Sequence, residues 1–167
     1  MTSIGACVAK AVCDAGPLIH LAEIHQESLL SQFSTLVIPA SVLSEAISFK
    51  APPNLRFEVQ TPSGNERLRA TESFLSTLEA GEVDAISICL TSPGAIFLSD
   101  DLKARMEAER LGIPVHGSLG IVVRAYRFGH LAFEDARLAL LQLGTCRSLF
   151  ISKAVVEAAL EALDKRI

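Results

Sequence analysis

The sequence predicts an α/β domain in which helices cover an open, parallel sheet. Short apolar runs alternate with helix-type stretches through the first 115 residues, which is the rhythm of βαβ units. The length of 167 residues suits one domain. Half of the residues are apolar and the mean hydropathy is +0.39, which indicates a well-buried interior. We therefore expect a single domain over residues 1–167, with a helical C-terminal end from about residue 117.

Five short runs have the composition of buried or half-buried strands. The first ends at Asp14, the second stops at Pro39, and the third alternates after the proline-rich loop at 51–54. The fourth follows a Ser-Pro-Gly turn and ends at an Asp-Asp pair. The predicted strands are residues 8–13, 35–38, 55–59, 95–98 and 113–115.

The stretches between and after these runs carry apolar residues at helical spacing. Pro17 suits the first turn of a helix, and its buried face is expected to continue to Leu30. Ser41 is expected to cap a helix that runs through Phe49, and Gly112 to end another. The remaining predicted helices are residues 65–78, 81–90, 102–111, 117–128, 133–143 and 152–163.

Composition excludes several classes of protein. A net charge of −4 does not suggest a general polyanion binder, and eight Phe, one Tyr and no Trp argue against a base-stacking platform. No apolar run approaches the ~20 residues of a membrane span. The four cysteines, at positions 7, 13, 89 and 146, lack zinc-ligand spacing. We expect reduced cysteines in a cytoplasmic protein. Nucleotide-cofactor and serine-hydrolase motifs are also absent.

Acidic residues directly follow two of the predicted strands. Asp14 follows the first, and Asp100 and Asp101 follow the fourth. Ligands of open α/β sheets bind beyond the carboxyl ends of the strands, so neighbouring strands would place these carboxylates in one crevice. Each of these residues is also a good helix cap, and this alternative stays open.

Two further acids are candidates for the same crevice. Asp84 lies in a nearly all-apolar helix, which is a poor place for a solvated carboxylate, although it could lie on a narrow polar stripe. Glu45 follows the second strand and is the weakest candidate. A cluster of carboxylates suits Mg²⁺ or Mn²⁺, which can activate water for phosphodiester hydrolysis.

Three nearby side chains are candidates for contact with a substrate. Ser99 offers a hydroxyl beside the Asp pair, or caps the next helix. Lys103 and Arg105 can reach a phosphate, or lie on a solvated helix face with neighbouring glutamates.

These residues carry a resemblance to a known family. The sequence resembles the PIN-domain family of metal-dependent ribonucleases, many of them toxins of toxin–antitoxin pairs, and is particularly similar to a branch of small predicted nucleic-acid-binding proteins. The resemblance covers essentially residues 8–160. It rests on five segments in order: CDAGPLI at 13–19, IPASVLSE at 38–45, GEVDAI at 81–86, LSDDLKAR at 98–105 and LGIPVHGSLG at 111–120.

The resemblance implies a three-layer α/β/α sandwich with strand order 3-2-1-4-5. It implies catalytic roles for Asp14, Glu45, Asp84 and Asp101, and metal binding by Asp14, Asp84, Asp101 or its neighbour Asp100. It also implies Mg²⁺ or Mn²⁺ as cofactor, RNA as substrate, an antitoxin partner and a homodimer; apolar helices such as residues 138–141 suit such protein contacts.

One departure from the family leaves other functions open. Many relatives carry Ser or Thr soon after the first Asp, where this chain has Ala15 and Gly16. A second hypothesis is therefore a non-catalytic PIN-like module that binds nucleic acid or protein. A third, weaker hypothesis is a magnesium-dependent phosphatase.

Overall fold

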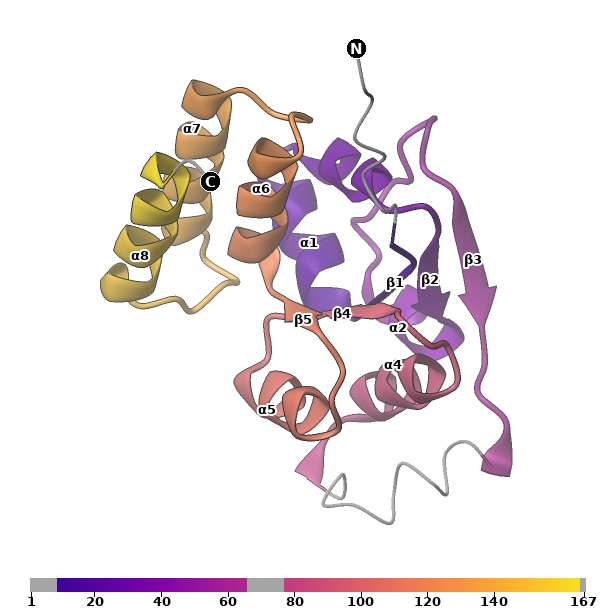
Figure 1. Cartoon of the computed structure of the whole chain (residues 1–167). Coiled ribbons are helices and arrows are strands. Elements are labelled where there is room, and N and C mark those ends of the chain that lie inside the picture. Colours follow the sequence, from indigo (N-terminus) through magenta and orange to yellow (C-terminus); the bar gives the residue numbers. More distant parts are fainter. Residues whose placement is uncertain (1–8, 66–76, 166–167) are drawn as a thin grey trace.

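The computed structural model describes residues 9–65 and 77–165. Its centre is a five-stranded sheet in which all neighbouring strands are parallel and the order is β3-β2-β1-β4-β5 (Figure 1). This order confirms the expected 3-2-1-4-5 arrangement. The strands are β1 (Ala11–Cys13), β2 (Leu36–Pro39), β3 (Phe57–Gln60), β4 (Ile96–Leu98) and β5 (Val115–His116).

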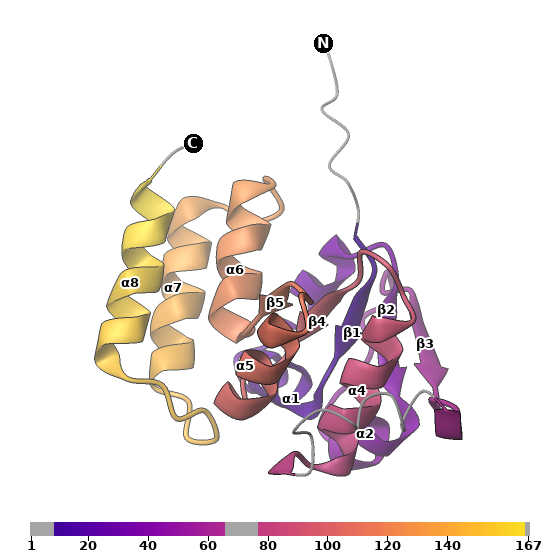
Figure 2. The same ribbon diagram turned by 60° about the horizontal axis from the view of Figure 1, so that its bottom comes forward.

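Helices cover both faces of this sheet. Figures 1 and 2 show α4 (Ala80–Leu90) and α5 (Leu102–Arg110) on one face, with α1 (Ala15–Glu23) and α6 (Ser118–Arg127) on the other. Two C-terminal helices, α7 (Phe133–Gly144) and α8 (Lys153–Asp164), stand beside α6 as an outer layer. The predicted helical C-terminal end is thus present. The short elements η1 (Glu27–Gln32) and α2 (Ala40–Glu45) complete the described fold.

The core divides into two clusters because successive strand residues point to opposite faces. In β1, Ala11 and Cys13 pack toward α1 and α6, whereas Val12 packs toward α4 and α5. The same alternation separates Phe97 from Leu98 in β4. Burial on both faces explains why these strands read as continuous apolar runs in the sequence.

The predicted helix from Pro17 to Leu30 is two elements. Helix α1 begins one residue after Asp14 and ends at Glu23, and the chain then turns through His25, whose φ is 56°. The Gln26 N–H donates to the Leu21 carbonyl at 2.8 Å, which closes the helix end. Leu29 and Leu30 are buried as expected, but from the separate 3₁₀ helix η1.

Two other predicted helices differ from the structure. Helix α2 ends at Glu45 rather than at Phe49, because Ala46 turns into the core and leaves Ile47 89% exposed. The Pro-Pro pair shortly afterwards also disfavours a longer helix. Most of the predicted helix at 65–78 lies outside the described residues. Within the described parts of the chain, no helix is long and apolar enough to cross a membrane.

The central strand position of Phe97 generates a stability prediction. Its side chain is fully buried between β4 and the α4–α5 face, so Phe97→Ala should lower the free energy of unfolding by about 3–5 kcal/mol. Phe57→Ala is the matched control, since Phe57 lies on edge strand β3 and is 42% exposed. Urea denaturation measures both variants. Equal losses of stability in the two variants would contradict the assignment of Phe97 to the core.

Candidate functional site

A crevice of about 410 Å³ opens at the carboxyl ends of β1 and β4. Because these parallel strands are neighbours, the residues that follow them, Asp14 and the pair Asp100–Asp101, meet there. Helix α2 adds Glu45, and the start of α4 adds Glu82. The structure therefore brings together four of the five acids singled out in the sequence, and adds two that were not, Glu79 and Glu82.

Asp14 lies at the base of this acidic crevice and is 7% exposed. Its Oδ1 accepts the Ala15 N–H at 2.8 Å as the N-cap of α1, and its Oδ2 accepts the Ser99 hydroxyl at 3.0 Å. Burial raises the pKa of Asp14 from 3.8 to about 6. The two hydrogen bonds oppose this rise in pKa, while the charges of Glu45 and Asp100 add to it. Asp14 is thus both a helix cap and a buried carboxylate with other acids nearby.

Asp100 is held by three hydrogen bonds. The backbone N–H of Ser118 donates to its Oδ1 at 2.7 Å, and the Ser118 hydroxyl donates to its Oδ2 at 2.6 Å. His20 Nδ1 lies 2.7 Å from the same Oδ2, with both side chains largely buried. Because an ionised carboxylate only accepts, Nδ1 carries the proton of this contact. Asp100 therefore ties α1 to the N-terminus of α6.

The His20–Asp100 contact lies directly against Gly16. A Cβ placed on Gly16 would lie 3.3 Å from Asp100 Cβ and 3.5 Å from His20 Cε1. A side chain at position 16 would therefore press on Asp100, which would have to give by a few tenths of an ångström. The four histidines of the sequence lack metal-ligand spacing, and the contact of His20 with Asp100 joins residues 80 positions apart in the chain, which no local pattern signals.

Asp101 and Glu45 are the more exposed acids of the crevice. Asp101 caps α5, and its Oδ1 accepts the Ala104 N–H at 2.9 Å. Glu45 reaches the crevice because α2 packs closely on the start of α4. A Cβ on Gly81 would lie 2.9 Å from Val42 Cγ2, so only glycine permits this approach.

Asp84 is the one predicted acid that does not line the crevice. It is 2% exposed and accepts the Ser41 hydroxyl at 2.7 Å, between α4 and α2. Glu82 lines the crevice instead, because two residues along a helix differ by about 200° in direction. Burial raises the pKa of Glu82 to about 7, and the charges of Asp14 and Asp101 contribute to this rise. The part assigned to Asp84 in metal binding and catalysis stays a prediction.

The predicted substrate contacts separate in the structure. Ser99 is fully buried and orients Asp14, while its Oγ also accepts the Asp101 N–H at 3.2 Å. Arg105 lines a second, larger cavity next to the crevice. Lys103 is exposed on α5 and lines neither cavity. On the same helix Glu107 pairs with Arg110. This ion pair belongs to the charged helix face that was the alternative to phosphate contact.

The donors of the crevice are chemically suited to a hard divalent cation. All of its acids offer oxygen atoms, which Mg²⁺ and Mn²⁺ prefer. Burial raises the pKa of both Asp14 and Glu82, and the charges of neighbouring acids add to this rise. Among residues 9–65 and 77–165, no three acidic, His or Cys side chains are already placed around one point. Asp14, Glu45, Glu82 and Asp101 are the side chains of the crevice that could hold such a cation.

Comparison with protein families agrees with this topology. A family model described as a PIN domain matches residues 10–165, which is nearly the whole chain. The chain belongs to the PIN-domain family. PIN domains are generally nucleases and typically use divalent metal ions. Comparison with curated proteins and with solved structures gives no significant match.

The raised pKa of Asp14 generates a prediction for the metal-free PIN domain. Between pH 4 and pH 6 the folded state binds the Asp14 proton more tightly than the unfolded state, so the free energy of unfolding falls as pH rises. Asp14→Asn removes this buried charge and should raise the free energy of unfolding above pH 6 by about 1–2 kcal/mol. Urea denaturation in EDTA at pH 5 and pH 8 measures the difference, which should be larger at pH 8.

The control for this prediction is Glu161→Gln, which neutralises an exposed carboxylate on α8. It should leave the free energy of unfolding nearly unchanged at both pH values. An Asp14→Asn variant that is less stable than the wild type at pH 8 would show that the Asp14 charge stabilises the fold.

Proposed function

We propose that this PIN domain is a Mg²⁺- or Mn²⁺-dependent endoribonuclease. The observation that carries the proposal is the position of Asp14. It is a buried carboxylate at the carboxyl end of the central strand, with a pKa raised to about 6, in a crevice that three other elements also supply with acids. This concentration of negative charge favours the binding of a cation in the crevice.

The residues of the crevice have distinct parts in this proposal. Asp14, Glu45, Glu82 and Asp101 would hold the cation, and Ser99 and the Ala15 N–H keep the Asp14 carboxylate in one orientation. A bound divalent cation supplies a coordinated water of lowered pKa and offsets charge on the phosphate. Asp100 acts as a positioning residue, since its hydrogen bonds to His20 and Ser118 fix the wall of the crevice.

The nuclease proposal predicts cleavage that needs both the metal and Asp14. Purified protein titrated with Mn²⁺ should cut a mixed RNA pool, and EDTA should stop the cleavage. Asp14→Asn should lower the rate by at least about 100-fold, because it removes a charged ligand at the base of the crevice. Gel analysis of the pool measures the rate.

The matched control is Asp135→Asn, an exposed acid in the first turn of α7, which should cut like the wild type. Full activity in a folded Asp14→Asn variant would overturn the assignment. Turnover of small phosphoesters without cleavage of RNA would select the phosphatase hypothesis.

A non-catalytic binding module is the second candidate, and the His20–Asp100 contact favours it. This contact engages one of the acids, and a Cβ at position 16 would lie only 3.3 Å from Asp100 Cβ. In that case the wild type would bind no Mn²⁺ in calorimetry and would cut nothing.

In this proposal the protein is the toxin of a toxin–antitoxin pair and acts as a homodimer in the cytoplasm. Apolar side chains on α7 support a protein contact, since Leu138 is 55% and Leu141 is 39% exposed. Light scattering after size exclusion should give twice the mass of one chain, because pairing would cover these side chains. A monomer at high concentration would contradict the homodimer.

A further inference from the structure

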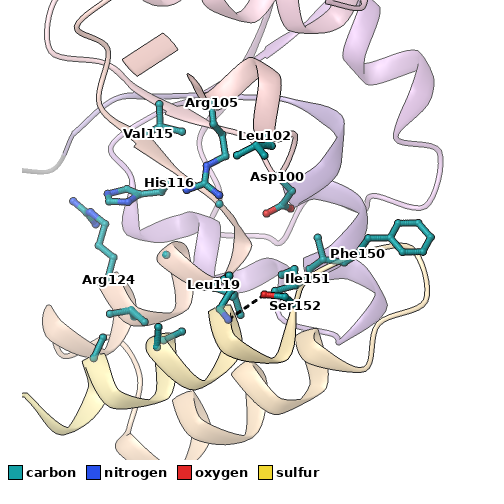
Figure 3. Close-up of a pocket in the computed structure, with 18 of the residues that line it drawn as sticks. Asp100, Leu102, Arg105, Val115, His116, Leu119, Arg124, Phe150, Ile151 and Ser152 are labelled. Carbon is teal, nitrogen blue, oxygen red and sulfur yellow. Dashed lines mark hydrogen bonds between the residues drawn. The ribbon is translucent and has the colours of Figure 1, made fainter. Parts of the chain in front are cut away.

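A second cavity lies beside the acidic crevice and is about twice its size. Its volume is about 840 Å³, and we call it the α6–α8 groove because these two helices form its walls. Apolar side chains such as Leu119, Val123 and Val155 line most of it, with Arg105 and His116 at the end nearest the sheet (Figure 3). It shares Asp100, Leu102, Leu149 and Phe150 with the crevice, so the two cavities adjoin.

The groove carries positive charge. Arg105, Arg124 and Arg127 line it, whereas Asp100 is the single acid among the described residues that do so. Burial lowers the pKa of His116, and the nearby charges of Arg124 and Arg105 lower it further. The groove therefore has the opposite charge to the crevice that it joins.

Two of these arginines are placed in different ways. The Arg124 guanidinium is held by Gln32, at 2.9 Å from its Oε1, and lies over the rings of Phe33 and Phe128. Arg105 points into the groove in Figure 3, and its buried Nε has no hydrogen-bond partner within the described residues. A guanidinium that lines a cavity and keeps one N–H without a partner favours an anionic ligand.

Phe150 stands at the junction of the two cavities and is 97% exposed. A fully exposed aromatic ring is costly to hydrate, and a nucleobase can stack on it. In a single strand of nucleic acid, flat bases alternate with charged phosphates. The apolar side chains of the groove can contact the bases, and its arginines can contact the phosphates.

We propose that the α6–α8 groove binds the nucleotides of single-stranded RNA next to the phosphate at the acidic crevice. A base stacks on Phe150, and Arg105 and Arg127 contact the phosphates. The choice of RNA rests on the proposed function. The groove itself requires unpaired bases, because a duplex would hide the base faces from Phe150.

The test is binding without catalysis. Fluorescence anisotropy of a short, labelled, single-stranded oligoribonucleotide of mixed sequence is measured in EDTA, over a range of salt concentrations. Phe150→Ala should weaken binding about tenfold, since stacking of one base contributes that much. Arg127→Ala should also weaken binding and lower the slope of log K against log salt by about 0.7. A duplex of the same sequence should bind more weakly than the single strand.

Matched controls lie on surfaces away from the groove. Phe57→Ala removes an exposed Phe from β3, and Arg137→Ala removes an exposed Arg from α7. Both should bind the oligonucleotide like the wild type. Phe150 and Arg127 are themselves exposed, so their variants should keep the melting temperature of the wild type.

The outcomes separate this inference from the proposed nuclease. If Phe150→Ala and Arg127→Ala bind the single strand as tightly as the wild type, the inference is overturned, even when metal-dependent cleavage is present. If they lose binding while the wild type cuts nothing with Mn²⁺, the groove is supported and the nuclease is not. If RNA binding is unchanged but the variants alter the mass found by light scattering, the groove is a protein contact and the inference is wrong.

Discussion

The burial of the Asp14 carboxylate at the end of the central strand is the constraint on which the rest of the structure depends. A carboxylate in this position is tolerated only because the α1 N-terminus and the Ser99 hydroxyl donate to it. Parallel pairing of β1 with β4 brings Ser99 to it, and the Asp14 N–H donates to the Leu98 carbonyl at 2.9 Å. The environment of Asp14 thus depends on the strand order and on the start of α1, and Asp14 in turn contributes to the charge of the crevice.

The acids around Asp14 are held by the same kind of interaction. Asp101 caps α5, and Asp100 receives the first N–H of α6. The capping alternative and the functional alternative considered for these residues are therefore not exclusive. A carboxylate that accepts backbone N–H groups on one side has a fixed orientation, and its remaining lone pairs are available to a ligand. At the N-terminus of α6, Asp100 already accepts the Ser118 N–H that a bound anion would otherwise meet.

The two adjoining cavities carry opposite charges, although the net charge of the chain is only −4. Acids gather on one side of Asp100 and arginines on the other. Net charge and pI are sums over the whole chain, so they do not show that opposite charges gather in two adjoining cavities. They are therefore poor guides to what such a protein binds. The scarcity of aromatic residues has a similar limit. It argues against an extended stacking surface, but a single exposed ring such as Phe150 is enough for one base.

Much of the fold and part of the site were predictable from local patterns. Doubly buried strands read as apolar runs, helices end at glycine or proline signals, and acids after β1 and β4 lie at one edge of any parallel sheet that pairs them. The predicted helix to Phe49 was wrong because packing of Ala46 into the core overrides local helical spacing. The continuous helix to Leu30 was wrong because the turn at His25 has no strong local signal.

What the sequence by itself determined is the alternation of strands and helices and the positions of Asp14, Asp100 and Asp101 at strand ends. Only the tertiary structure decided which way each side chain of α4 points, so that Glu82 faces the crevice and Asp84 faces Ser41. It also decided the contacts of His20 and Phe150, whose neighbours come from segments far apart in the chain. The physical reason is that periodicity records whether a residue is buried, whereas the identity of its partner depends on how distant elements pack.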